Sequence, residues 1–196
     1  MWCNSWVDEM VEVVSAAPIE AADRFLTEWA ASLGIELESL AEDLVDDTRR
    51  GPSGEPLFRS YSLSRAKAAE VYAAAGKPIP MTQSQVVGHL ASTASAVRNL
   101  VDEQVEDNGE VLLHLFVARC RDLAIDAFER GESDLSARIV AALDDGLREG
   151  DAAVVNAIAV SFVEDTPLWD PDRSDFIESW PQALQQEAQR QRRAGS

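Results

Sequence analysis

Apolar residues recur at helical spacing along most of the chain, most clearly between Asp102 and Phe128. After an acidic run and a turn at Asn108-Gly109, the apolar positions lie three, four or one residue apart: Leu112, Leu115, Phe116, Cys120, Leu123, Ala127 and Phe128. This spacing places them on one side of a helix of about five turns. We therefore expect residues 110–128 to form a central core helix with Asn108 as its N-cap.

The same periodicity predicts further helices before and after this one. They are expected over residues 6–14, 18–33, 36–45, 62–75, 83–105, 135–147, 151–163 and 182–193. Glycine and proline separate many of these segments, as they do between helices of globular proteins. The predicted fold class is all-α, an irregular multi-helix bundle of about nine or ten helices.

Three segments fall outside the helical pattern. Residues 49–61 carry two prolines and two glycines, which predicts a long loop. Residues 77–82, with two prolines, are a linker candidate between an N-terminal helical part (residues 1–76) and a C-terminal bundle (residues 83–196). The pattern leaves open whether these two parts pack as one unit. Trp169, Phe176 and Trp180 are expected to fold a polar segment back over the helices.

The net charge of -18 restricts the partners that the chain can bind. Such a charge repels nucleic-acid phosphates and anionic membranes, and it favours encounters with basic proteins. No direct nucleic-acid or membrane binding is therefore expected. Two acidic runs are candidates for an interaction face: Glu38, Glu42, Asp43, Asp46 and Asp47 in the first, and Asp102, Glu103, Glu106 and Asp107 in the second. The alternative is that these residues are the solvated sides of helices.

Targeting and cysteine patterns point to a cytoplasmic protein. No apolar run reaches the ~20 residues that a membrane helix needs, and the acidic start of the chain does not resemble a signal peptide. Cys3 and Cys120 are too few for a disulfide framework or a zinc pattern. We expect Cys120 to be a small buried apolar residue.

Motifs for catalysis are sparse. The sequence contains neither a phosphate-binding glycine loop nor the Gly-x-Ser-x-Gly pattern of a serine nucleophile, so no catalytic residue and no cofactor is assigned. Glu110 and His114 are four residues apart and could supply two metal ligands from one helical face, with His89 as a further member of such a site. The alternative is a histidine that is hydrogen-bonded at the margin of the core.

Several short motifs between residues 100 and 180 carry a resemblance. They are Leu-Val-Asp-Glu from Leu100, Glu-x-Asn-Gly-Glu-Val-Leu-Leu-His-Leu from Glu106, Leu-Asp-Asp-Gly-Leu from Leu143, and Val-x-Asn-Ala-Ile-Ala-Val-Ser-Phe-Val-Glu from Val154. This region resembles an uncharacterised family of small, acidic, all-helical bacterial proteins, a domain of unknown function. The resemblance implies helical architecture and assigns no catalytic residues. Residues 1–80 resemble no family that we can name.

Three hypotheses about function remain. The first is a non-enzymatic interaction protein of the immunity or inhibitor kind, which neutralises a basic partner. The second is a small enzyme or metal-binding protein with a site near Glu110 and His114. The third is a homo-oligomeric structural subunit. The charge and the missing catalytic motifs favour the first hypothesis.

Overall fold

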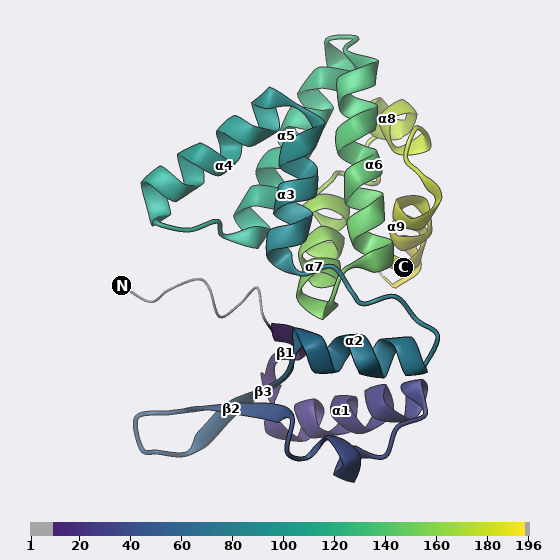
Figure 1. Ribbon diagram of the computed structural model, residues 1–196. Helices are drawn as coiled ribbons and strands as arrows, with labels where there is room; N and C mark the ends of the chain where they lie inside the picture. The colour runs from purple at the N-terminus through teal and green to yellow at the C-terminus, as the bar shows by residue number, and fades with distance from the viewer. Residues whose placement is uncertain (1–9, 195–196) are drawn as a thin grey trace. The chain divides into compact units, whose positions relative to one another are not determined.

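The computed structural model describes residues 10–194, which divide into two compact units (Figure 1). The N-terminal unit comprises the residues up to Thr82 together with Asp151–Ala153, and the C-terminal unit comprises Gln83–Gly150 and the chain from Val154 onward. Cys3 and the first part of the predicted helix 6–14 lie outside the described residues. The prediction that residues 77–82 link two independent parts stays a prediction.

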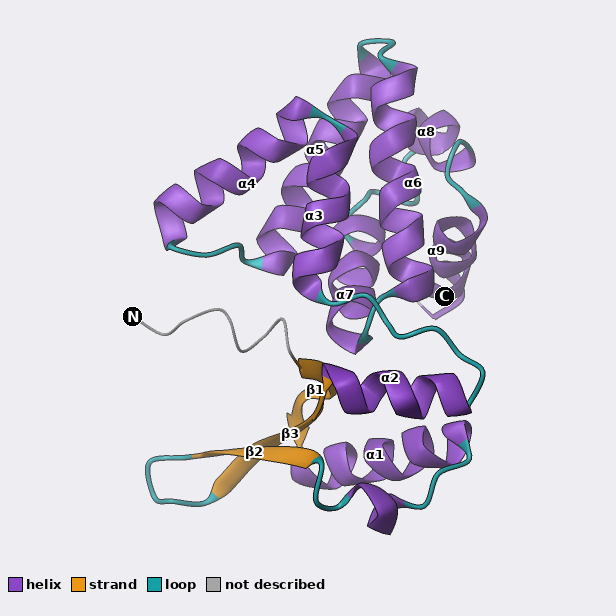
Figure 2. Cartoon of the chain, viewed as in Figure 1, coloured by secondary structure: helices purple, strands orange, loops and turns teal. Residues whose placement is uncertain are grey.

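The N-terminal unit contains an antiparallel sheet, so the all-α prediction is wrong (Figure 2). Its strands are β1 (Met10–Pro18), β2 (Leu44–Arg50) and β3 (Pro56–Ser64), arranged in the order β1-β3-β2. Both neighbouring pairs run antiparallel. The described chain is therefore mostly helical with one three-stranded sheet, and its N-terminal part is not purely helical.

Strand β1 replaces the described part of the predicted helix 6–14. Val11, Val13 and Val14 are all buried, and β-branched side chains such as these fit a pleated strand well. The register between β1 and β3 shifts between Glu12 and Val14. This irregularity breaks the strict alternation of a strand and gives the apolar residues a helix-like spacing. A run this short cannot be assigned from periodicity alone.

The β2–β3 hairpin overturns the predicted helix 36–45 and the predicted loop 49–61. Residues Leu37–Leu40 form a short 3-10 helix, η2, and β2 follows it. The prolines and glycines do mark a turn, where the Gly51 amide donates to the Glu55 carbonyl at 2.8 Å and Gly54 has φ of 82°. Strand β2 is polar and largely exposed, so hydrophobic alternation gave no signal for it. In β3, the buried Tyr61 and Leu63 alternate with serines, but this run is too short to distinguish a strand by periodicity alone.

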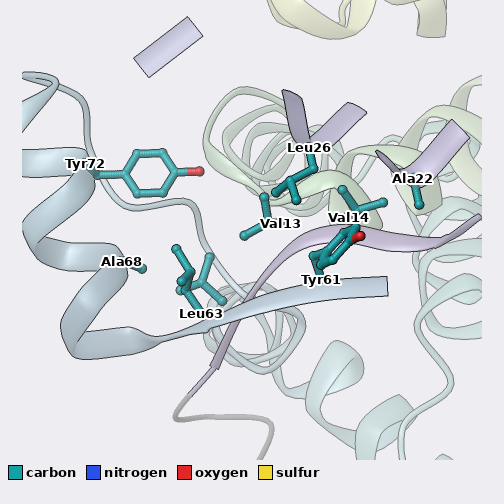
Figure 3. Close-up of a cluster of buried hydrophobic side chains, with 9 residues drawn as sticks. Val13, Val14, Ala22, Leu26, Tyr61, Leu63, Ala68 and Tyr72 are labelled. Atoms are coloured by element: carbon teal, nitrogen blue, oxygen red, sulfur yellow. The ribbon is translucent and has the colours of Figure 1, made fainter. Parts of the chain in front are cut away.

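Helices α1 (Ile19–Leu33) and α2 (Arg65–Ala74) confirm two predicted helices. The end of α1 at Gly34 uses a left-handed backbone, with φ of 70°, which glycine adopts without strain. The side chain of Ser64 caps α2 by accepting the Lys67 amide. The core of this unit joins β1, β3 and both helices (Figure 3) and includes Val11, Val13, Val14, Ala22, Leu26, Tyr61, Leu63, Ala68 and Tyr72.

A polar network ties α1 to the sheet beside this core. The Tyr61 hydroxyl donates to Asp23 Oδ1 at 2.6 Å, and the Arg59 guanidinium lies 3.1 Å from the same carboxylate. The hydrogen bond from Tyr61 and the charge of Arg59 hold the pKa of Asp23 below its usual range. Because the folded state then prefers ionised Asp23, this contribution to stability is present at neutral pH and is lost as the pH falls through the lowered pKa.

We expect Tyr61→Phe to lower the free energy of unfolding by about 1 kcal/mol at neutral pH, because it removes one hydrogen bond to a partly exposed carboxylate. The loss should shrink at acidic pH, where Asp23 is protonated in both proteins. Urea unfolding of both proteins across the acidic range would check this. A difference between them that does not depend on pH would contradict the role of the Asp23 charge.

The C-terminal unit is helical throughout its described residues. Its helices are α3 (Gln83–Thr93), α4 (Ser95–Asn108), α5 (Leu113–Glu129), α6 (Ser133–Glu149), α7 (Ala152–Ile158), the π-helix η3 (Ala159–Glu164), the 3-10 helix η4 (Pro171–Arg173), α8 (Ser174–Glu178) and α9 (Gln182–Ala194). The start of α7 falls within the N-terminal unit. Helices α5 and α6 pack against each other, with Phe116, Cys120, Ile139 and Leu143 fully buried.

Three details of the predicted central region are wrong. The predicted helix 83–105 is interrupted at Ala94, which has an extended backbone between α3 and α4. Asn108 does not cap the central helix, because it is the last residue of α4 and α5 begins only after Leu112. Leu112 and Leu115 were predicted to be buried and are instead 43% and 44% exposed.

Aromatic side chains attach α8 to the bundle. Phe176 lies 5.4 Å from Phe128 and 5.6 Å from Trp180, while Phe162 lies 4.9 Å from Trp180, measured between ring centroids. Phe176 and Trp180 are buried, as the sequence predicted for the returning segment. Trp169 does not follow them, since 69% of its surface is exposed.

Asp144 of α6 holds the start of α9. The first amides of a helix have no partner within the helix, and Pro181 precedes α9 without offering a capping side chain. The buried Asp144 carboxylate fills this role by accepting the Leu184 amide at 3.1 Å, and its second oxygen accepts from Arg148 Nε at 3.0 Å. A carboxylate at this position also suits the helix dipole.

We expect Asp144→Ala to lower the free energy of unfolding by about 1–3 kcal/mol, because the buried Leu184 amide loses its acceptor. The matched control is Asp145→Ala, one residue away on a more exposed carboxylate. Chemical denaturation and hydrogen exchange at the first turn of α9 would measure the two effects. Equal losses in both variants would contradict the capping role.

Candidate functional site

The corner between α4 and α5 is fixed by side-chain hydrogen bonds. Gln104 Oε1 accepts the Leu112 amide at 3.0 Å, and Asn108 Nδ2 donates to the Gln104 carbonyl at 3.2 Å. Gln83 Nε2 donates to the Val111 carbonyl at 2.9 Å. Gly109 makes the turn possible with φ of 79°, a left-handed conformation that favours glycine. The exposed residues on both sides therefore lie on a defined backbone.

Three large apolar side chains are exposed at this corner. Val105, Leu112 and Leu115 are 47%, 43% and 44% exposed. Leu112 and Leu115 are three residues apart at the start of α5, so they lie on neighbouring positions of the helix surface. Val105 lies near the C-terminal end of α4, one residue after Gln104, whose side chain bonds to the Leu112 amide. Exposed apolar groups in one place mark interaction sites more often than scattered ones do.

Carboxylates are exposed on the same stretch of chain as these apolar residues. Asp102, Glu103, Glu106 and Asp107 are all exposed on α4, and Glu110 is exposed in the turn that follows. Glu103 pairs with Arg119 of α5 at 2.9 Å. We call these five acids, with Val105, Leu112 and Leu115, the acidic corner surface. It combines exposed apolar and exposed anionic side chains.

Gln104 leaves a buried hydrogen-bond donor without a partner beneath this surface. The residue is 3% exposed, and its Nε2 has no hydrogen-bond partner within residues 10–194. Exchanging the oxygen and nitrogen of the Gln104 side chain would not satisfy this donor. The backbone amide of Leu112 donates a hydrogen bond and therefore requires the Gln104 oxygen at its present position. An unsatisfied buried donor costs about 1–3 kcal/mol. Such a cost is typical of places where stability is not the only requirement.

The first predicted acidic run belongs to the other unit and has a different local structure. Glu38 lies on η2, Glu42 and Asp43 lie between η2 and β2, and Asp46 and Asp47 lie on β2 rather than on a helix. Asp43 is paired with Lys67 at 3.1 Å, and Asp46 lies 3.4 Å from Arg59. The predicted interaction residues therefore form two separate groups.

Glu110 and His114 do not share a helical face, because Glu110 lies in the turn before α5 begins. Within the described ranges, no group of three or more His, Cys, Asp and Glu side chains could hold a metal ion. His89 Nε2 of α3 contacts Asp145 Oδ2 of α6 at 3.1 Å. The geometric argument for a metal site at Glu110 and His114 thus loses its basis.

His114 instead joins a hydroxyl and an amide from the C-terminal helices. Its Nδ1 lies 2.8 Å from Ser161 Oγ on the π-helix η3, and its Nε2 lies 3.5 Å from Asn156 Nδ2 on α7. A serine bonded to a histidine, which in turn contacts an amide, can support acyl transfer when the serine is accessible to substrate. Ser161 is only 5% exposed, and its carbonyl accepts from Arg121 at 3.1 Å. The arrangement binds η3 to α5.

Cys120 is the other side chain with nucleophilic potential in this unit. It is fully buried, as the sequence predicted, and burial raises the pKa of its thiol to about 12. The thiolate is the reactive form of cysteine, so this thiol is inert at physiological pH. Among residues 10–194, no helix is long and apolar enough to cross a membrane.

Comparison with known proteins assigns this unit to a family. The model of the family described as Domain of unknown function (DUF7674) matches residues 88–194, which is more than half of the chain. The chain belongs to this family. The predicted resemblance of residues 100–180 to an uncharacterised family is thereby confirmed. The DUF7674 region includes the whole acidic corner surface and the contacts of His114. No curated protein and no solved structure matches the chain.

We expect Gln104→Met to speed hydrogen exchange at the start of α5, because the Leu112 amide loses its acceptor. The free energy of unfolding should fall by less than about 1–3 kcal/mol, because the substitution also removes the unpaired Nε2 donor. Gln189→Met, on the exposed side of α9, is the matched control and should have little effect. Thermal unfolding and hydrogen exchange of residues 109–116 would measure both. Unchanged exchange at Leu112 would contradict the role of Gln104 in fixing the corner.

Proposed function

We propose that the DUF7674 region is a non-enzymatic interaction module that binds a basic, amphipathic segment of a partner protein at the acidic corner surface. The observation that supports this most directly is the exposure of Val105, Leu112 and Leu115 beside five exposed acids. An apolar stripe of the partner would cover the three apolar side chains. Its lysines and arginines would face the carboxylates.

The two parts of this surface have different roles in binding. Burial of apolar area supplies most of the affinity and is largely insensitive to salt. The carboxylates speed the encounter and orient the partner, and salt weakens both effects. The net charge of -18 extends the same attraction over longer distances. A basic amphipathic helix is the simplest partner that satisfies both parts.

An immunity or inhibitor role is a finer form of the same proposal. A protein of that kind covers the functional surface of a basic partner and needs no catalytic group of its own. The buried Ser161 hydroxyl and the inert Cys120 thiol are consistent with a non-enzymatic module. The enzyme hypothesis has less support, because the ring nitrogens of His114 lie beside Ser161, which is buried, and Asn156.

A synthetic amphipathic peptide of leucine and lysine tests the proposal in isothermal titration calorimetry with the full chain. We expect the double variant Leu112→Ser, Leu115→Ser to weaken binding about tenfold or more at every salt concentration, because the apolar contact is lost. The double variant Glu106→Lys, Asp107→Lys should weaken binding most at low salt and reduce its salt dependence.

Asp126→Lys, Glu164→Lys is the matched control, because it changes the net charge equally at exposed positions outside the acidic corner surface. This control should retain most of the affinity. If it weakens binding as much as Glu106→Lys, Asp107→Lys does, the peptide recognises the overall charge and the proposed surface is wrong. Unchanged binding by Leu112→Ser, Leu115→Ser would reject the apolar contact.

A further inference from the structure

Strand β2 lies at an edge of the three-stranded sheet. Only one of its sides pairs with another strand among residues 10–194, and that strand is β3. Five of its seven residues are exposed. An open edge presents unpaired backbone groups that can pair with another strand, and proteins usually protect such edges with repelling charges. The charges on β2 have a different arrangement.

The centre of β2 reads Asp46-Asp47-Thr48-Arg49-Arg50, with two acids before Thr48 and two bases after it. When two copies of such a strand pair antiparallel around a twofold axis at Thr48, every acid faces a base. Asp46 lies opposite Arg50 of the second copy, and Asp47 lies opposite Arg49. Residues directly opposite each other in an antiparallel pair project on the same face of the sheet, so their side chains meet.

We propose that a second copy of this chain pairs with the free edge of β2 and extends the sheet to six strands across a twofold axis at Thr48. The contact is isologous, since the same surface of both copies forms it. It lies in the N-terminal unit, outside the DUF7674 match, and goes beyond the function proposed for that region.

The charge pattern also selects the register. A twofold axis that relates two antiparallel strands is perpendicular to the sheet. The residue at the axis must therefore lie opposite the same residue of the second copy. The neighbouring symmetric registers are centred on Asp47 or on Arg49. The first would place two aspartates face to face, and the second would place two arginines face to face, which destabilises a strand pair. Only the register centred on Thr48 pairs opposite charges at every position from Asp46 to Arg50.

Contacts within the unit leave Asp47 and Arg49 suited to this role. Neither residue lies within ion-pair distance of an opposite charge in the described chain, although burial raises the pKa of the Glu12 carboxyl and the charge of Arg49 opposes that rise. Asp46, in contrast, lies 3.4 Å from Arg59. Arg50 donates to the Gly54 carbonyl at 3.0 Å and keeps further N–H groups for a carboxylate. Val45, Leu57 and Phe58 of the same hairpin are 49%, 45% and 42% exposed. These side chains offer apolar area beside the charged pairs.

The association should be weak, because a single short strand contributes a small interface. Sedimentation equilibrium of the full chain from micromolar to millimolar concentration measures it. We expect the average mass to rise from that of a monomer to that of a dimer. Asp47→Arg alone and Arg49→Asp alone should each remain monomeric, because each places like charges opposite each other. An equimolar mixture of these two variants should form dimers again.

Glu20→Arg and Arg24→Asp on the exposed side of α1 are matched controls that alter net charge by the same amounts. Both should dimerise like the unchanged chain. Hydrogen exchange gives a second measurement, since the outward amides of β2 should become protected as concentration rises. A chain that stays monomeric at millimolar concentration would overturn the proposal. So would dimers that survive both β2 variants, or a mixture that fails to restore them.

Discussion

The packing of α5 against α6 is the contact on which the C-terminal unit depends. Small buried residues lie on the packed side of α5, among them Cys120, Ala124 and Ala127, and small residues allow neighbouring helices to pack closely. The Ser136 hydroxyl donates to the Ala124 carbonyl at 2.9 Å and fixes the register between them. The remaining helices of the unit attach to this pair through different chemistry.

These attachments explain why the acidic corner surface is open. Aromatic rings hold α8, the Asp144 carboxylate holds α9, and the Ser161–His114 hydrogen bond holds η3. Helix α4 diverges from the α5–α6 pair toward the corner (Figure 1), so it covers less of the first turn of α5. Leu112 and Leu115 are therefore exposed although their spacing is that of core residues. The corner keeps its shape through Gln104, at the cost of an unsatisfied donor.

The two units use their acids differently. In the C-terminal unit, exposed carboxylates on α4 occur with exposed apolar residues, and Glu103 pairs with Arg119. In the N-terminal unit, two acids precede two bases along β2; Asp46 lies close to Arg59, and Asp43, just before the strand, pairs with Lys67. The net charge of -18 does not reveal this difference, because it is a total over both units and carries no information on where the charged side chains lie. The first arrangement suits a basic partner, and the second suits a second copy of the same chain.

The sequence alone determined most of the helical scaffold. Apolar spacing and glycine stops were enough for α1, α2 and α6, because those helices bury one side and end close to a glycine. It also identified Asn108-Gly109 as a corner, since a left-handed turn favours glycine. Asp102 and Glu103 of the second acidic run were correctly placed on a helix, whereas Glu106 and Asp107 lie on the same helix beyond its predicted end at residue 105.

Only the tertiary structure decided the sheet and the exposure of individual residues. Strands β2 and β3 are stabilised by pairing with residues on other strands. The polar sequence of β2 carries no alternation that would reveal it, and in β3 the alternation is confined to Tyr61 and Leu63 between serines. The exposure of Leu112 and Leu115 depends on the angle at which α4 leaves α5, and the contact between His114 and Ser161 depends on how η3 packs. Periodicity shows which side of a helix is apolar, but not whether another element covers it, because covering depends on the packing of residues far apart in the sequence.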